Sequence, residues 1–485
     1  MSQDNKSRKI SRRGVVGGVA AGGALSSLPL SLDVGSSSLI GKKPIAHAAG
    51  EAASDASAAK APRKISWRNW SGSQICTPES RVAPKDEAAL AEVVRGSNGP
   101  IRPVGAGHSF TELVPTDDTI VSLARFSGVQ SHENDPLQAR IGAGTRLGAI
   151  GAPLAGLGQG LYNMPDIDQQ TLAGATATAT HGTGANLSAL HHYITEMRLM
   201  TANGEVLELS REKDADFFDA ARVSLGALGI VTEFTLRNQP TYRLEKTTWT
   251  EPFEDVLNRL DELGSEYRNF EFYYIPYSDL AMCIGHKDTD KDIVPRPPSE
   301  DNEGVLQLRD IRDWLSWWPW ARRQVTRGAL KDTPMEYAVD EWYKIYPSER
   351  MVRFNEMEFH VPQEEGAAAI RAIKERMERD MPQVFFPFEF RFIDEDDAWI
   401  SPFYKRKSCS IAIHRYFEED HRSYFELMEP IYRKHGGRAH WGKHNSLTAE
   451  DCAALYPKWN DFLEVRRELD PEGKFLNGYL KDLLV

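Results

Sequence analysis

Two glycine-rich segments have the composition needed to bring main-chain amides close to a phosphate: residues 102–110 (RPVGAGHSF) and 171–184 (TLAGATATATHGTG). Glycine has no Cβ, so the N–H groups of such a loop can close around an anion. One Gly-x-Gly loop would be weak support, because ordinary turns also need glycine. Two such loops, the first with a histidine directly after its glycines, predict a binding site for a phosphate-bearing ligand.

A second set of residues, nearer the C-terminus, has the types needed for acid–base and electrostatic chemistry. Glu389 and Arg391 are two apart on an expected strand, so their side chains leave the same face. Such a pair can be an ordinary surface ion pair, but the surrounding phenylalanines indicate a buried strand, where a charge is costly unless it has a partner or a task. Lys443 adds a cation, and His414 lies on an alternating polar strand. Cations stabilise a negative charge that develops on oxygen, and Glu389, His414 and Lys443 all stay open as the base.

Together these motifs resemble the vanillyl-alcohol-oxidase superfamily. Within it they are similar to the sugar-lactone and alditol oxidase branch, whose members include gulonolactone and D-arabinono-1,4-lactone oxidases. The resemblance covers residues 65–485. It implies an α+β fold, in which a two-part FAD-binding domain of the PCMH type is followed by a substrate-capping domain built from a sheet and helices. It also implies that the phosphate-bearing ligand is FAD.

The resemblance assigns contacts with FAD to a set of residues in and near the two loops: Val104, Gly105, Ala106, Gly107, His108, Ser109, Pro165, Gly174, Thr178, Thr180, His181, Gly182, Gly184 and Ile230. In the resembled branch, the histidine that matches His108 bonds covalently to the 8α-methyl group of the flavin. Related galactonolactone dehydrogenases have a leucine there and bind FAD non-covalently. From spacing alone, His108 would be a histidine satisfied by turn hydrogen bonds; with the second loop present, we expect the covalent link. Ile230 is the expected contact of the adenine.

The same resemblance places the four residues of the C-terminal set around the substrate, above the flavin: Glu389, Arg391, Lys443 and His414. It implies oxidation of a hydroxyl group of a sugar lactone, alditol or related polyol, with hydride transfer to flavin N5 and O2 as the acceptor that gives H2O2. Pro165 falls where the backbone of the family passes the flavin C4a edge. Its fixed φ can hold that edge open to O2, or it can simply shape a turn. Two alternatives stay open: a dehydrogenase that uses a quinone or cytochrome, and a secreted carbohydrate-binding protein without turnover.

Other kinds of site receive little support. His181 with His191 and His192 fits no recognised zinc pattern and has no acidic or cysteine partner nearby in sequence, so no metal site is predicted. The net charge of −12 argues against a nucleic-acid partner. The cysteines are widely scattered: Cys76, Cys283, Cys409 and Cys452. They either form disulfides after export or stay as reduced, buried thiols.

Residues 1–48 have the features of a twin-arginine signal peptide. Arg12 and Arg13 precede an apolar stretch rich in glycine and alanine, and an Ala-x-Ala cleavage site follows. A basic arm or an uncut anchor is the alternative. Because glycines and Pro29 oppose a stable spanning helix, no stable membrane insertion is expected after cleavage. The predicted location is therefore extracytoplasmic or secreted.

The length of 485 residues favours two domains in the remaining chain. Residues 49–64 form an Ala/Ser linker, 65–240 the FAD-binding domain and 241–485 the substrate domain, whose C-terminal tail is implied by the resemblance to return to the FAD domain. Residues 287–334 are predicted to leave the substrate-domain sheet as an excursion. The aromatic run at 314–320 could be a membrane or partner patch, but packing beneath a long loop is the favoured interpretation.

Hydrophobic periodicity predicts the elements that position these residues. In the FAD-binding domain these are helices 86–94 and 214–223 and strands 101–104, 119–123, 138–141, 194–199, 206–209 and 230–236. In the substrate domain they are strands 270–274, 351–360, 385–393 and 409–416 and helices 253–263, 364–379, 424–434 and 453–469. The second pattern suits a sheet that is covered by helices on one face.

Overall fold

The computed structural model describes residues 64–299, 301–331 and 335–485. The predicted signal peptide and nearly all of the predicted linker lie outside these ranges. Of the helices within them, none is long and apolar enough to cross a membrane. All four cysteines lie within the described ranges and are free thiols, so the disulfide alternative is not realised.

The N-terminal half contains two main sheets. The first is parallel, in the order β3 (Ser80–Val82), β5 (Thr119–Ser122), β4 (Ile101–Val104). The second is antiparallel, in the order β10 (Val206–Ser210), β9 (Ile194–Met200), β11 (Ile230–Arg237), β7 (Gln138–Gly142), β6 (Val129–Ser131). Two short pairs join β1 (Trp67–Arg68) to β2 (Ile75–Cys76) and β8 (Gln159–Gly160) to β12 (Gln239–Pro240). This arrangement confirms the predicted two-part α+β domain, including each of its predicted strands.

Four helices accompany these sheets: α1 (Glu87–Gly96), α2 (Gly151–Gly156), α3 (Leu172–Ala177) and α4 (Ala215–Ala221). The first begins where the sequence predicts, because Asp86 caps it by accepting a hydrogen bond from Ala89 N at 2.8 Å. Its apolar face is buried through Leu90 and Val94. The predicted helix 214–223 is present as α4 but is shorter at its C-terminal end.

The C-terminal half contains one antiparallel sheet of eight strands, in the order β16-β13-β15-β14-β18-β19-β17-β20. Its strands are β13 (Arg243–Pro252), β14 (Asn269–Ile275), β15 (Leu280–Thr289), β16 (Glu336–Glu341), β17 (Phe354–Pro362), β18 (Phe388–Ile393), β19 (Ser408–Tyr416) and β20 (Arg438–Ala439). The four predicted strands are β14, β17, β18 and β19. Strand β18 begins later than predicted because Pro387 has no N–H to give to the ladder. Strands β13, β15, β16 and β20 were missed. Strands β13 and β16 carry polar residues on both faces, and β20 has only two residues.

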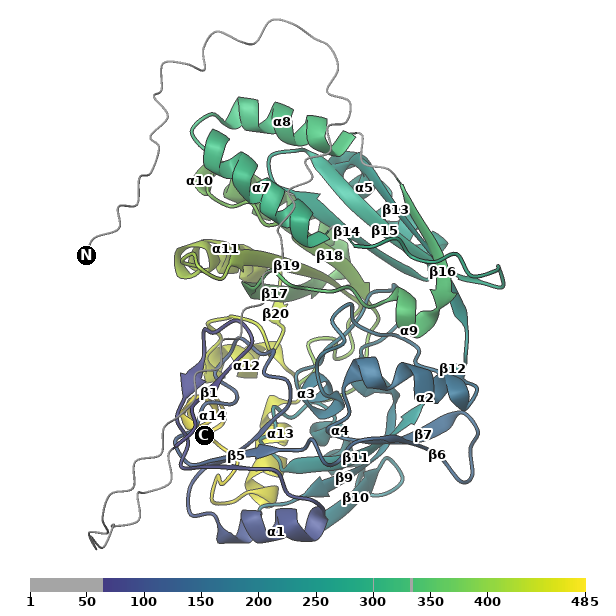
Figure 1. Cartoon of the computed structure of the whole chain (residues 1–485). Helices are drawn as coiled ribbons and strands as arrows, with labels where there is room; N and C mark the ends of the chain where they lie inside the picture. The colour runs from purple at the N-terminus through teal and green to yellow at the C-terminus, as the bar shows by residue number, and fades with distance from the viewer. Residues whose placement is uncertain (1–63, 300, 332–334) are drawn as a thin grey trace, which may run out of the picture. The chain divides into compact units, whose positions relative to one another are not determined.

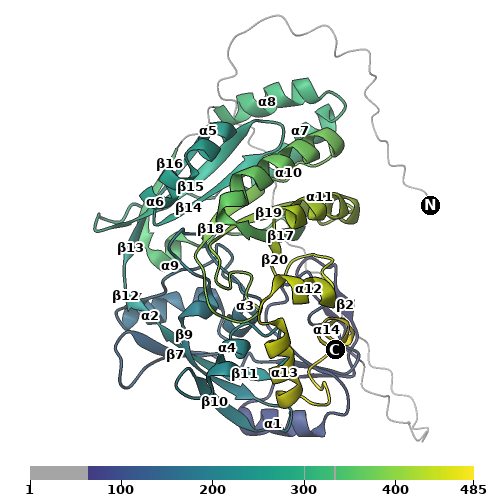
Figure 2. The same ribbon diagram turned by 180° about the vertical axis from the view of Figure 1, so that it is seen from behind.

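Helices cover one face of this sheet, as Figure 2 shows. They are α5 (Phe253–Asn258), α6 (Leu260–Glu266), α10 (Gly366–Asp380) and α11 (Arg422–Lys434). The predicted helix 253–263 is in fact two helices, because the chain leaves helical geometry at Arg259, with φ −119° and ψ 16°. The predicted helix 453–469 is also two, α12 (Ala449–Leu455) and α13 (Trp459–Leu469), and Pro457 between them cannot continue the hydrogen-bond ladder.

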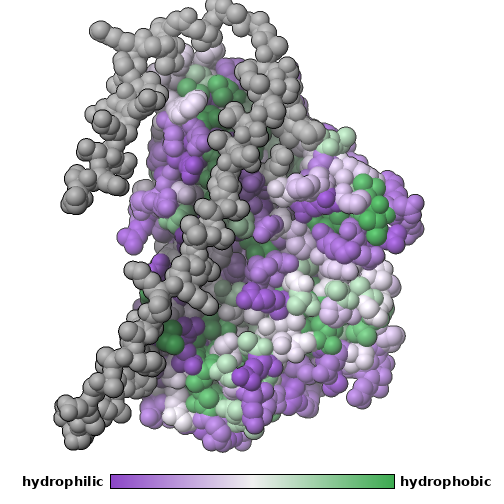
Figure 3. Space-filling model, viewed as in Figure 1, coloured by the Kyte–Doolittle hydropathy of each residue, from purple (hydrophilic) through white to green (hydrophobic). Residues whose placement is uncertain are grey.

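The predicted excursion at 287–334 contains a helical hairpin, α7 (Asp301–Leu315) and α8 (Pro319–Lys331), and the short α9 (Trp342–Ile345) follows β16 (Figure 1). Pro319 is the first residue of α8, where a missing N–H has little cost. Four residues of the aromatic run are exposed: Trp314, Trp317, Trp318 and Trp320. The favoured interpretation, packing beneath a loop, is therefore wrong for these side chains. In Figure 3, hydrophilic residues cover most of the visible face and hydrophobic ones form small separate groups.

The C-terminal tail, which ends in α14 (Gly478–Leu484), contacts the N-terminal half. Ile101 N donates to Lys474 O at 2.9 Å. Asn477 Nδ2 donates to the main-chain oxygens of Glu112 and Pro115 at 2.7 and 2.8 Å. These contacts flank the first glycine-rich loop, so the tail helps to fix its position.

Candidate active site

One cavity of about 790 Å³ lies between the glycine-rich loops and the face of the eight-stranded sheet that α5, α6, α10 and α11 leave uncovered. Residues 104–109 of the first loop line it, and so do Pro165, Gly174, Thr178, Thr180 and His181. The four predicted catalytic residues line the same cavity: Glu389, Arg391, Lys443 and His414. The structure therefore brings together two sets of residues that are more than two hundred positions apart in the sequence.

The two loops contact each other directly. A Cβ at Gly105 would lie 2.1 Å from Thr171 Oγ1, so only glycine lets the loops approach this closely. Gly107 has φ +73°, a conformation that glycine adopts at little cost. The resulting wall consists mainly of main chain and small side chains, which fits a ligand whose pyrophosphate must approach main-chain amides.

Three of the predicted FAD contacts do not line the cavity: Gly182, Gly184 and Ile230. A Cβ at Gly182 or Gly184 would lie 2.3 or 2.8 Å from the nearest neighbouring atom, so these glycines allow close packing of the loop. Ile230 belongs to the hydrophobic core, whereas Gly229 and Val231 line the cavity. Successive strand residues face opposite sides, which explains why the cavity meets the neighbours of Ile230.

His108 presents its ring to the cavity. The ring stacks on Trp70 with a centroid distance of 5.3 Å and an interplanar angle of 20°. Within the described residues it has no hydrogen-bond partner, so the turn hydrogen bonds of the alternative interpretation are not formed. Burial, with the nearby charges of Lys443 and Arg146, lowers the pKa of His108 to about 4. The imidazole is therefore neutral at physiological pH and keeps a nitrogen lone pair.

Strand register explains why the sheet presents polar side chains to the cavity. Directly opposed residues of antiparallel strands point to the same face. Eight residues from β14, β18, β19 and β17 share this face: Glu271, Tyr273, Glu389, Arg391, Ser410, His414, Glu356 and Glu358. The predicted position of Glu389 and Arg391 on one face is thus part of a larger polar surface.

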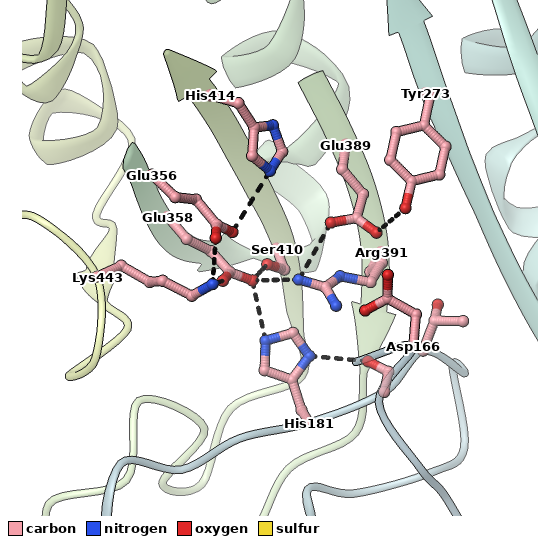
Figure 4. A network of polar contacts seen from close by, with 12 residues as sticks. Asp166, His181, Tyr273, Glu356, Glu358, Glu389, Arg391, Ser410, His414 and Lys443 are labelled. Carbon is pink, nitrogen blue, oxygen red and sulfur yellow. Dashed lines mark hydrogen bonds and ion pairs between the residues drawn. The ribbon is translucent and has the colours of Figure 1, made fainter. Parts of the chain in front are cut away.

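Glu358, only 1% exposed, is the centre of a hydrogen-bond network (Figure 4). Its Oε1 accepts from Arg391 Nη2 at 2.7 Å and from Ser410 Oγ, and lies 3.0 Å from His181 Nε2. His181 Nδ1 is 2.8 Å from Gly182 O, so both ring nitrogens face oxygen atoms. Burial alone would raise the pKa of Glu358, but Arg391 and His181 hold it well below its usual range. This carboxylate therefore links the second glycine-rich loop to the sheet.

Glu356 holds Lys443 and His414. Its carboxylate pairs with Lys443 Nζ, and its Oε1 lies 3.6 Å from His414 Nε2. Burial acts to raise the pKa of Glu356, yet Lys443 and His414 outweigh burial and lower it to about 2. Lys443 Nζ also lies 3.9 Å from Glu358 Oε2, so this side chain contacts two carboxylates. This geometry argues against Lys443 as the base.

Two contacts fix the Lys443 segment to the first glycine-rich loop. Phe110 N donates to Gly442 O at 2.7 Å, and Thr111 Oγ1 donates to Trp441 O at 2.8 Å. The Lys443 ammonium lies 5.3 Å from the centroid of the Phe110 ring. The loop that is predicted to hold the flavin and the cation that is predicted to act on the substrate are therefore held together.

Glu389 is held by one group of its own strand and one group of β14. Its Oε2 lies 3.3 Å from Arg391 Nη2, and its Oε1 accepts from Tyr273 OH at 2.6 Å. Arg350 donates to the same tyrosine oxygen at 3.2 Å and pairs with Asp166 at 2.8 Å. Burial raises the pKa of Glu389 more than Arg391 lowers it. A carboxylate with a raised pKa is a stronger proton acceptor, which keeps Glu389 a candidate base.

His181, Glu358 and His360 lie close enough to one another to hold a metal ion. One oxygen of this carboxylate, Oε1, contacts the guanidinium of Arg391 at 2.7 Å, so a metal cation bound to Glu358 would lie close to a like charge. His191, considered with His181 in the sequence, instead contacts Asp396 Oδ2 at 2.7 Å. The structure thus gives His181 an acidic partner that is remote in sequence.

Five site residues are missed by the sequence prediction: Asp166, Tyr273, Arg350, Glu356 and Glu358. A signal for the last two exists in residues 354–360 (FNEMEFH), where glutamates alternate with buried apolar residues. Alternation of this kind normally indicates a strand with one solvated face. The polar face here is buried against cations that lie elsewhere in the sequence, and this pairing is visible only once the strands are placed.

This fold and site can be compared with known proteins. A family model described as D-arabinono-1,4-lactone oxidase matches residues 234–483, and one described as FAD binding domain matches residues 78–210. The L-gulono-1,4-lactone dehydrogenase of Mycobacterium tuberculosis is 37% identical and aligns over 86% of this chain and 99% of that protein. The L-gulonolactone oxidase of Bos taurus is 29% identical, over 86% of this chain and 98% of that protein. Among solved structures, cholesterol oxidase from Brevibacterium sterolicum has the same fold, with a TM-score of 0.71 at 16% identity, over 88% of this chain and 99% of that chain.

The fold and the cavity define an FAD-linked oxidoreductase. The chain belongs to the D-arabinono-1,4-lactone oxidase family. FAD is its cofactor, and the predicted resemblance to the sugar-lactone and alditol oxidase branch is confirmed. Because this is a family of enzymes, the alternative of a non-catalytic carbohydrate-binding protein is set aside.

Proposed function

We propose that this protein oxidises a hydroxyl group of a sugar lactone, alditol or related polyol in the cavity described above. The observation that carries the proposal is the buried polar face, on which three carboxylates (Glu356, Glu358 and Glu389) meet two cations (Arg391 and Lys443) and the imidazole of His181. Such a surface offers donors and acceptors to several hydroxyl groups at once, whereas a mostly apolar pocket would suit an apolar alcohol. The names of similar proteins, which include gulonolactone oxidase and alditol oxidase, are consistent with a substrate rich in hydroxyl groups.

The residues have separable roles in this proposal. Arg391 and Lys443 stabilise the negative charge that develops on the substrate oxygen as its proton leaves. Glu389 and His414 are the two groups placed to accept that proton, and Tyr273 orients Glu389. FAD, when bound, supplies the acceptor for the hydride. Glu356 and Glu358 act indirectly, because they hold the cations in place.

We also propose that FAD is bonded covalently to His108. The neutral ring, its position on the cavity wall and its lack of a hydrogen-bond partner within the described residues all support this assignment. A covalent link would benefit an exported enzyme, which has no means of replacing a lost cofactor.

The electron acceptor is proposed to be O2, with H2O2 as the product. Pro165 is buried and lines the cavity, next to Asp166. In this proposal the fixed φ of Pro165 keeps a path for O2 open. A dehydrogenase with a quinone or cytochrome acceptor is the alternative, and one similar protein carries that name.

Reoxidation kinetics decide between these two acceptors. Substrate-reduced enzyme mixed with air-saturated buffer in a stopped-flow instrument should recover its oxidised flavin spectrum within seconds, with one H2O2 released per flavin. A reduced flavin that persists for minutes in air, but reacts rapidly with an artificial quinone, would make the protein a dehydrogenase.

Residues 1–48 are proposed to be a twin-arginine signal peptide, followed by a linker at 49–64. We further propose 65–240 as the FAD-binding domain and 241–485 as the substrate domain. The sequence features of the signal support export to an extracytoplasmic or secreted location.

Replacing both Arg12 and Arg13 by lysine tests the export proposal. The twin-arginine route reads both guanidinium groups, so the double variant should stay in the cytoplasm as the uncleaved precursor. Fractionation followed by immunoblotting would show this, with a single exposed lysine variant, Lys434→Arg, as the control. Secretion of the double variant at the wild-type level would contradict the proposal.

A further inference from the structure

The polar face of the eight-stranded sheet does not end at the site described above. Register carries it from β18 across four more strands, β14, β15, β13 and β16, to the edge of the sheet. One directly opposed row runs Arg391, Glu271, Ile284, Thr248, Glu336. Since neighbouring strands are about 4.8 Å apart, Thr248 lies roughly 14 Å from Arg391 across the sheet. All five residues line the same cavity.

Polar side chains in this extension are buried without partners. Lys246 and His286 are directly opposed on β13 and β15, and each is 5% exposed. Neither ring nitrogen of His286 has a hydrogen-bond partner. Among the residues that the structure describes, Lys246 has no hydrogen bond and no ion pair, and the same holds for the side chain of Glu271, which is 8% exposed. Buried polar groups without hydrogen-bond partners destabilise the fold. Their presence here indicates that a ligand forms hydrogen bonds with this part of the cavity.

Apart from Lys246, the side chains of the extension carry little net charge. Burial, with Lys246 nearby, lowers the pKa of His286 to about 3, so its imidazole both donates and accepts. Burial and Glu389 raise the pKa of Glu271 to about 8, so at neutral pH it is largely a carboxylic acid that can also donate. Arg296, the other cation of this wall, already pairs with Glu336 at 3.3 Å. A neutral imidazole, a protonated carboxyl group and an ion-paired guanidinium are better hydrogen-bond partners for the hydroxyl groups of a ligand than for a strongly anionic group.

Apolar side chains line the cavity as well, and Val305 and Leu308 of α7 pack against the cluster of Phe110, Phe354, Phe385 and Phe386. Val305, Leu308 and Ile311 are three apart on α7, so they share one face of that helix, and all three line the cavity. Met282 and Ile284 add apolar surface on the sheet side. A sugar ring has the same division, since its hydroxyls project from the rim and its C–H bonds form an apolar face.

We propose that the surface formed on the sheet by Lys246, Thr248, Glu271 and His286, together with the apolar Met282 and Ile284, is a second sugar subsite. It would bind a neutral glycosyl unit attached to the end of the substrate that is remote from the oxidised hydroxyl. The inference rests on the proposed function and deepens it, because it assigns the enzyme a glycosylated lactone or alditol as the preferred substrate.

Kinetics with paired substrates test the subsite. Holoenzyme is assayed with glucitol and gluconolactone and with their galactosyl derivatives, lactitol and lactobionolactone. The wild type should have a kcat/KM at least tenfold higher for the derivative than for the parent. Lys246→Met and Thr248→Val should each reduce this ratio at least fivefold. Neither variant should lower Tm, since Lys246→Met removes a buried charge that has no described partner.

The control is Lys287→Met, the same change one residue from His286 but at a half-exposed lysine that pairs with Glu266. It should keep the wild-type ratio. The inference is overturned if the parents reduce the flavin but the derivatives have no higher kcat/KM, or if neither subsite variant changes the ratio of the two kcat/KM values. The extension would then hold only water, and the proposed function would stand. If neither parents nor derivatives reduce the flavin, the proposed function itself fails.

Discussion

Replacing Lys443 by alanine is expected to slow the reduction of the flavin by substrate about a hundredfold or more, the scale of a lost group that stabilises developing charge. The physical reason is its position: Lys443 pairs with Glu356, lies 3.9 Å from Glu358 and is fixed to the first glycine-rich loop through the neighbouring Gly442. Arg391→Ala should have an effect of similar size. Anaerobic stopped-flow spectroscopy measures the rate directly, and the FAD content should stay near normal.

Loss of Lys443 also leaves Glu356 as a buried carboxylate without its main counter-ion, which by itself can cost about 3–5 kcal/mol. The double variant Lys443→Met, Glu356→Gln removes this complication, because the cation and the charge that needs it disappear together. The Tm of this double variant should be higher than that of Lys443→Ala, but its flavin should still be reduced slowly by substrate. The matched control is Lys434→Ala, a change at an exposed lysine, in which substrate should reduce the flavin at the wild-type rate. Wild-type speed in Lys443→Ala would show that this ammonium does not act on the substrate.

The His108→Ala variant is expected to lose the whole covalent flavin signal. Wild-type protein precipitated with acid and run on a denaturing gel should fluoresce at the position of the chain, and the variant should not. The expectation follows from a neutral ring on the cavity wall, stacked on Trp70 and without a described hydrogen-bond partner.

Mass spectrometry of a wild-type digest should place the added mass of FAD on the peptide that contains His108. The control variant is His132→Ala, on a surface segment of the FAD-binding half, which should keep the fluorescent band. Release of all flavin from the wild type by acid would refute the covalent bond and leave non-covalent FAD binding intact.

Local patterns allowed most of the site to be predicted. The glycine-rich loops could be recognised because glycine is needed where main chain approaches main chain, as at Gly105 beside Thr171. Glu389 and Arg391 could be placed on one face because strand side chains alternate. Glu358 could not be predicted as a site residue in this way, because its role depends on contacts with His181 and Arg391, which are far away in the sequence.

Other failures have equally physical causes. The predicted helix 253–263 breaks at Arg259, and nothing in its hydrophobic pattern marks that break. The hairpin of α7 and α8 was missed because its apolar side chains are divided between the cavity and an exposed tip. The resemblance pointed to Ile230, whereas Gly229 and Val231 line the cavity, because a match to a family motif does not fix which face of the strand meets the ligand.

The central claim is that a hydroxyl group of the substrate is oxidised in this cavity while bound FAD is reduced. Anaerobic titration of the purified holoenzyme with sugar lactones and alditols, followed by visible absorption, tests it most directly. We expect the flavin absorbance of the wild type to bleach with at least one such compound, and to bleach about a hundredfold more slowly in Lys443→Ala. A flavin that dithionite reduces but that no lactone, sugar or alditol bleaches would contradict this account.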